Sequence, residues 1–191
     1  MAAAVPTAAE SPTPETPVAR PVRLVRVAVL IIAGIAIAFT ATLHEQLGFD
    51  LGVTAAIFGL IAIAHLLEWF SVRASGGNAV PLLLAVVSIA AAVALPITGS
   101  VIGFAVIVAA WALVSALLEF VGSTVRPGSR QDAVFLGAIG ILLALLTILV
   151  RTDQVAILGF LGAYAMVAGV FLGISAFDTR RTATSVAATE Q

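Results

Sequence analysis

The sequence predicts an all-α integral membrane protein with six transmembrane helices. The 191-residue chain is 61% hydrophobic and 10% charged, whereas soluble domains carry about 25% charged residues. Six windows approach the length of about 20 mainly apolar residues that a helix needs to cross the hydrocarbon. None of these windows alternates between polar and apolar residues, so the spans are helices and not the strands of a membrane barrel.

The six predicted spans are separated by short polar stretches. They run over residues 24–43, 52–71, 80–98, 101–121, 133–150 and 155–176. Residues 1–21 are rich in Ala, Pro, Thr and Glu, and such a segment buries too little apolar surface to fold, so we expect a disordered cytoplasmic tail. We expect a second disordered tail over residues 179–191 and a six-helix membrane domain over residues 22–178.

The distribution of arginine predicts the orientation of the spans. The chain has no lysine, and in a six-span topology Arg151 is the single arginine on one side. The other side carries Arg20, Arg23, Arg26, Arg73, Arg126, Arg130, Arg180 and Arg181. Cytoplasmic loops are enriched in basic residues, so both termini are predicted to be cytoplasmic.

A short phrase recurs at the end of alternate spans. Leu66-Leu67-Glu68-Trp69 returns as Leu117-Leu118-Glu119-Phe120, and a weaker copy lies between Gly169 and Arg181. Each copy ends a span that runs toward the predicted cytoplasmic side. We therefore expect three repeated hairpins of parallel topology. Their approximate bounds are 22–75, 79–128 and 131–181.

Two stretches within the even-numbered spans carry a family resemblance. They are Ala110-Trp111-Ala112-Leu113-Val114-Ser115-Ala116-Leu117-Leu118-Glu119 and Leu161-Gly162-Ala163-Tyr164-Ala165-Met166-Val167-Ala168-Gly169-Val170-Phe171. With the closing Ser175-Ala176-Phe177 and Arg180-Arg181, they resemble the HdeD family of small bacterial membrane proteins. The resemblance covers residues 22 to about 181. It implies six spans and, from the family's named member, a role in acid resistance, and it implies no catalytic residues.

Ionisable residues are rare in the predicted spans, and each is a functional hypothesis because a charge is costly in lipid. Glu68 and Glu119 lie near the cytoplasmic ends of two spans, and His65 shares a helix face with Glu68. Histidine titrates near about pH 6.5, so these three residues form a candidate proton-responsive site. The structural alternative is that both glutamates are interfacial anchors, with Glu68 paired to Arg23 or Arg26.

Small residues at four-residue spacing predict how the helices pack. The pairs are Gly34 and Ala38, Ala112 and Ala116, Gly140 and Ala144, and Gly169 and Gly173. In lipid, helices associate through close backbone approach at such positions. We interpret the pairs as seams within one chain, with self-association as the open alternative.

These observations favour a non-enzymatic multi-span protein of the bacterial plasma (inner) membrane. As the resemblance to the HdeD family implies, it would act in acid resistance or envelope stress, or as an accessory partner of other membrane proteins. The alternative is a small transporter or channel with proton-sensitive gating. An enzyme is disfavoured because the sequence has no nucleophile-base constellation and no phosphate-binding loop. We expect no cofactor, no metal site and no nucleic-acid partner, and contact with the lipid bilayer and with a second copy or a membrane-protein partner.

Overall fold

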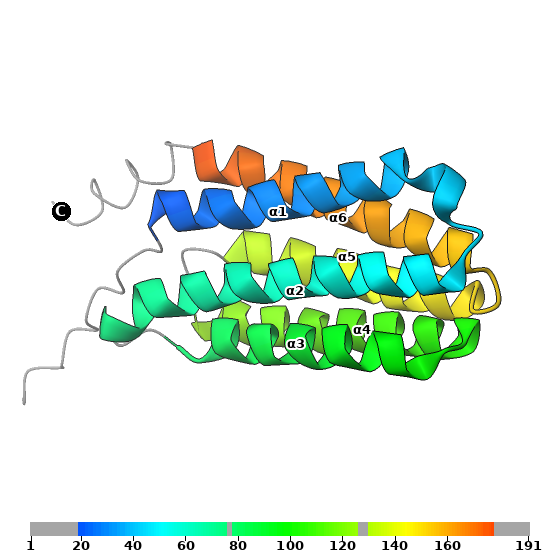
Figure 1. Ribbon diagram of the computed structural model, residues 1–191. Helices are drawn as coiled ribbons and strands as arrows, with labels where there is room; N and C mark the ends of the chain where they lie inside the picture. Colours follow the sequence, from blue (N-terminus) through cyan, green and yellow to red (C-terminus); the bar gives the residue numbers. More distant parts are fainter. Residues whose placement is uncertain (1–18, 76–77, 126–129, 178–191) are drawn as a thin grey trace, which may run out of the picture.

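Six helices run roughly along one direction and form a bundle (Figure 1). The computed structural model describes residues 19–75, 78–125 and 130–177. The helices are α1 (Arg20–Phe39), α2 (Leu47–Val72), α3 (Val80–Thr98), α4 (Val101–Val125), α5 (Arg130–Leu149) and α6 (Gln154–Phe177). All six are long and apolar enough to cross a membrane, and the described residues contain no strand. The predicted all-α membrane class is confirmed, and most of both predicted tails lies outside the described residues.

The helices begin and end at different residues from the predicted spans. α2 begins at Leu47 instead of residue 52, and α5 begins at Arg130 instead of residue 133. Both extensions add an aspartate to the first turn of a helix, where a negative charge is favourable. α1 ends at Phe39, and a short 3₁₀ turn follows over Ala41–Leu43. The apolar windows therefore located the spans correctly. The helices begin earlier than the windows because their first turns contain polar residues, which a hydropathy criterion leaves out of a span.

The six helices close into a ring. Each helix packs on its neighbours in the sequence, α1 packs on α6, and α6 also touches α2 and α4. The closest packing joins α2 to α3, α4 to α5 and α1 to α6. The tightest partners thus come from different predicted hairpins, and the three-hairpin repeat stays a prediction.

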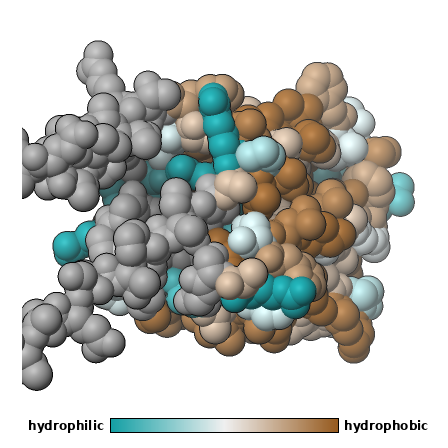
Figure 2. Space-filling model, turned by 90° about the vertical axis from the view of Figure 1, so that its left-hand side faces the viewer, coloured by the Kyte–Doolittle hydropathy of each residue, from teal (hydrophilic) through white to brown (hydrophobic). Residues whose placement is uncertain are grey.

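Both ends of the described chain lie at the same end of the bundle (Figure 1). There the guanidinium of Arg20 lies 4.5 Å from the centre of the Phe177 ring. Figure 2 views this end, where hydrophilic residues gather, while hydrophobic residues cover the visible flank. Half-exposed apolar side chains such as Ile32 and Leu145 belong to the flanks of the helices. In a bilayer these flanks face lipid, so their exposure carries no penalty.

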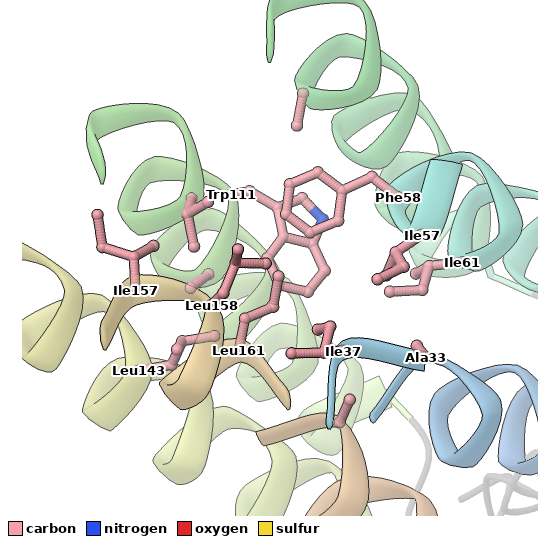
Figure 3. Packing of buried hydrophobic residues seen from close by; sticks show 14 of the residues in the cluster. Ala33, Ile37, Ile57, Phe58, Ile61, Trp111, Leu143, Ile157, Leu158 and Leu161 are labelled. Atoms are coloured by element: carbon pink, nitrogen blue, oxygen red, sulfur yellow. The ribbon is translucent and has the colours of Figure 1, made fainter. Parts of the chain in front are cut away.

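An apolar core fills the centre of the ring. Phe58 of α2 stacks on Trp111 of α4, with ring centroids 4.3 Å apart. Leu158 and Leu161 of α6 lie beside this pair in Figure 3. Trp111 is therefore buried at a contact between α2 and α4.

Glycines allow α1 and α6 to approach closely. A Cβ added at Gly169 would lie 2.8 Å from Ile31 Cγ1 and 3.2 Å from the Ile31 backbone nitrogen. A Cβ added at Gly34 would lie 3.0 Å from the backbone oxygen of Gly162. The glycines predicted to form seams therefore close the ring between its first and last helices.

A second seam joins α4 to α5. A Cβ added at Gly140 would lie 3.1 Å from Ala116 Cβ and 3.3 Å from the carbonyl oxygen of Ala112. The small residues predicted on these two helices thus face one another within one chain. Self-association through other surfaces stays a prediction.

The close approach of α1 and α6 predicts that valine destabilises the protein at Gly169 of α6 but not at Gly159 of the same helix. Gly169→Val should lower the free energy of unfolding by about 1–3 kcal/mol, as overpacking commonly does, because the new side chain meets the backbone of α1. Gly159→Val is the matched control, since a Cβ there would have nothing within 4 Å. Thermal unfolding in mild detergent measures both variants, and equal midpoints would contradict the seam.

Candidate functional site

The three predicted site residues meet around an arginine of α1. Arg26 forms an ion pair with Glu119 of α4 through Nη2 and Oε1, and its Nη1 lies 3.8 Å from Glu68 Oε2 of α2. His65 Nδ1 lies 3.9 Å from the same Glu68 oxygen, which is longer than a hydrogen bond. The structure therefore brings His65, Glu68 and Glu119 together, and Arg26 lies at their centre. We call these four residues the Arg26 cluster.

The Arg26 cluster is largely removed from solvent. The side chains of Arg26, Glu68 and Glu119 are 18%, 13% and 12% exposed, and that of His65 is 5% exposed. A buried cation needs compensating charge because desolvation costs several kcal/mol for each ion. Two carboxylates supply that charge, and the cluster joins α1 to both α2 and α4.

The spacing of arginines at the start of α1 explains how Arg26 reaches this position. Arg20, Arg23 and Arg26 recur every three residues, so they lie along one side of the helix. Arg23 Nη2 lies 3.2 Å from Asp132 Oδ2 of α5 and donates to Ser175 Oγ of α6 at 3.3 Å. The Ser175 hydroxyl donates to the same Asp132 oxygen at 2.6 Å. Side chains from one turn of α1 thus contact four other helices.

The sequence left Arg23 and Arg26 as alternative partners of Glu68. The structure places Arg26 beside Glu68, while Arg23 pairs with Asp132. The sequence interpretation missed Asp132, because it counted this residue in the polar stretch before a span. The signal was present as an aspartate in the first turn of α5, within reach of arginines at the same end of the bundle.

A small cavity lies beside the Arg26 cluster. Its volume is about 20 Å³, which is enough for a single water molecule. Its lining includes Arg26, His65, Ser115, Glu119 and Tyr164. A cavity of this size does not hold a cofactor.

Two buried polar atoms that line this cavity have no hydrogen-bond partner within the described residues. They are His65 Nδ1 and Ser115 Oγ. Nearby, the indole of Trp111 is satisfied, because Nε1 donates to Ser88 Oγ at 3.0 Å. Among the residues that line the cavity, His65 and Ser115 therefore carry the buried atoms that still lack a hydrogen bond.

A second buried polar pair lies at the other end of α1. His44 Nδ1 lies 2.7 Å from Asp50 Oδ1, and the two side chains are 3% and 0% exposed. The sequence interpretation placed Asp50 in the loop between the first two spans. The signal was the spacing of a histidine and an aspartate across a short turn between two helices.

The described part of the chain contains no group of three or more His, Asp or Glu side chains that could hold a metal ion. Comparisons with protein-family models, with curated proteins and with solved structures found no match. The resemblance to the HdeD family thus rests on the sequence stretches quoted above.

The Arg26 cluster predicts that removing its cation is costly. Arg26→Gln should lower the free energy of unfolding by up to about 3 kcal/mol, because two carboxylates lose their buried counter-charge. The double variant Arg26→Gln with Glu119→Gln should recover part of this loss, as coupled partners do. Thermal unfolding in detergent of the wild type, the two single variants and the double variant measures the coupling between Arg26 and Glu119.

Arg151→Gln is the matched control for this experiment, because Arg151 is exposed and follows α5 at the opposite end of the bundle. If Arg26→Gln and Arg151→Gln unfold at the same temperature, the Arg26 cluster does not stabilise the bundle.

Proposed function

We propose that this multi-span protein acts without catalysis in the bacterial plasma membrane, in acid resistance or envelope stress, as its resemblance to the HdeD family implies. The observation that carries the proposal is the ion pairing of Arg26 with two glutamates beside an unpartnered histidine nitrogen. A cluster of this composition changes its charge when protons bind.

Acid weakens the Arg26 cluster in two ways. A protonated glutamate no longer attracts the guanidinium, while arginine keeps its charge at every physiological pH. Protonation of His65 adds a second positive charge near Arg26. Attraction within the cluster is therefore present at neutral pH and is lost as the pH falls.

The position of Arg26 turns this local change into a change in helix packing. Its partners belong to α2 and α4, so loss of the ion pairs loosens the start of α1 from both helices. In acid, the N-terminal end of α1 would then become exposed to lipid or to an accessory membrane-protein partner, and this exposure would be the signal.

A small transporter or channel with proton-sensitive gating is the second candidate. The cavity beside His65 and Ser115 favours it, because both residues can hydrogen-bond to a passing molecule. A continuous path needs a longer polar lining, whereas this cavity has room for about one water molecule. The geometry therefore supports acid response more strongly than transport.

The acid-response proposal predicts a survival defect. Cells that lack the gene should survive acid exposure less well, and the wild-type gene should restore survival. In the Glu68→Gln and Glu119→Gln double variant both side chains are neutral at every pH, as the glutamates are in acid, so its thermal stability in detergent should not fall as the pH is lowered, whereas that of the wild type should. Arg151→Gln should restore survival as well as the wild type does.

Unchanged survival of the deletion strain would overturn a role in acid resistance. Flux across proteoliposomes that disappears in the same double variant would instead support the transporter.

The proposed orientation predicts which engineered cysteines are accessible from outside the cell. The chain has no cysteine, so single substitutions at exposed positions give clean labelling sites. Thr152→Cys, between α5 and α6, should react with a membrane-impermeant thiol reagent in intact cells. Ala79→Cys, between α2 and α3, should react only after lysis. The reverse pattern would contradict cytoplasmic termini.

A further inference from the structure

The buried pair of His44 and Asp50 joins three helices at the end of the bundle opposite the Arg26 cluster. His44 follows α1, and Asp50 lies in the first turn of α2. His44 Nε2 lies 2.9 Å from the carbonyl oxygen of Ile37, near the end of α1. The Gln154 side chain of α6 donates to the backbone oxygen of His44 at 2.9 Å.

The contacts of the His44 ring determine where its protons lie. A carbonyl oxygen can only accept, so Nε2 must carry a proton to bond to Ile37. Thr40 agrees with this assignment, because its hydroxyl donates to the Ala36 carbonyl and leaves Oγ1 free to accept from Nε2 at 3.4 Å. The opposite nitrogen, Nδ1, faces Asp50 Oδ1 at 2.7 Å.

The short contact between Nδ1 and Oδ1 requires one further proton. Without it, the lone pair of a neutral imidazole would face an ionised carboxylate at 2.7 Å in a buried site. The proton can lie on Nδ1, which gives an imidazolium and a carboxylate, or on Asp50, which gives two neutral groups. In both arrangements the pair binds one proton more than a free neutral histidine with an ionised aspartate.

We propose that His44 and Asp50 form a proton-binding site that keeps one shared proton at neutral pH and ties the end of α1 to the start of α2. This site is separate from the Arg26 cluster and does not depend on the function proposed for that cluster. Its ligand is the proton itself.

The ends of two helices favour the charged arrangement of the pair. His44 bonds to a carbonyl at the C-terminus of α1, where a positive charge is stabilised. Asp50 lies near the N-terminus of α2, where a negative charge is stabilised. The described residues offer no other charged side chain that pairs with either group. The neighbours from α1 and α6 are the neutral Ile37 carbonyl, Thr40 hydroxyl and Gln154 amide.

The pair also has a place for a second proton. Asp50 Oδ2 is buried and has no hydrogen-bond partner among the described residues. Thr54 Oγ1, one turn later on α2, is likewise buried without a partner. A proton added at Oδ2 leaves Oδ1 able to accept from Nδ1, so no existing hydrogen bond is lost. Binding of a second proton in acid therefore keeps the contact between the helices.

Nuclear magnetic resonance of the full chain labelled with ¹⁵N-histidine tests the shared proton. His65→Asn leaves His44 as the single histidine, because the chain has two. At about pH 8, above the ordinary titration of histidine near 6.5, we expect two protonated ring nitrogens. If the proton lies on Asp50 instead, His44 has one protonated ring nitrogen, and the infrared spectrum shows a protonated carboxyl band that disappears in Asp50→Asn. This result would equally support the shared proton.

A ring with one protonated nitrogen and an ionised Asp50 at that pH would overturn the proposal. Glu45→Gln is the matched control, because it removes an exposed carboxylate next to His44 and should leave the spectrum unchanged. If Asp50→Asn fails to fold, His44→Gln with the infrared measurement still decides the outcome. Without the His44 imidazolium, the fully buried Asp50 carboxyl should itself hold a proton at neutral pH, and an Asp50 that is ionised in His44→Gln would contradict the site.

Discussion

An arginine at the edge of a bilayer must find a counter-charge, and the arrangement of helices around α1 depends on this constraint. Arg26 draws carboxylates from α2 and α4, and Arg23 contacts an aspartate of α5 and a serine of α6. Lipid gives no hydrophobic drive for helices to associate. Ion pairs at one end and glycine seams along the length therefore provide the specificity that core burial provides in a soluble bundle. The closed ring follows, because α1 must lie within reach of α2 on one side and α6 on the other.

Buried charges are compensated differently at the two ends of the bundle. The Arg26 cluster uses a cation that keeps its proton and depends on carboxylates that can lose their charge. The proposed His44–Asp50 site uses two groups that exchange a proton between themselves and keep their contact with one proton or two. In the proposed functions, acid therefore loosens the end that carries the arginines and leaves the opposite end joined. α1 would pivot about the end that stays joined.

The sequence predicted the spans, the small-residue seams and the shared face of His65 and Glu68, because each depends on composition or on local helical spacing. It placed Glu119 near them through the recurrence of the Leu-Leu-Glu phrase. It did not predict the contact of Arg23 with Asp132 or that of His44 with Asp50. Both aspartates lie just before an apolar window, so hydropathy assigned them to loops, whereas each belongs to the first turn of a helix. The partner of Arg23 lies 109 residues away in sequence. That pairing depends on the order of helices around the ring, which hydropathy does not describe.

The contacts of α1 have a consequence for the order in which the protein can assemble. Chains emerge from the ribosome with the N-terminus first, yet the partners of α1 are made late. Glu119 follows Arg26 by 93 residues, and Ser175 follows Arg23 by 152. Until then both guanidinium groups must stay at the membrane surface, which their long side chains and their position at the start of the helix allow. α1 therefore reaches its final place late, and the bundle is complete when the glycines of α6 dock against α1.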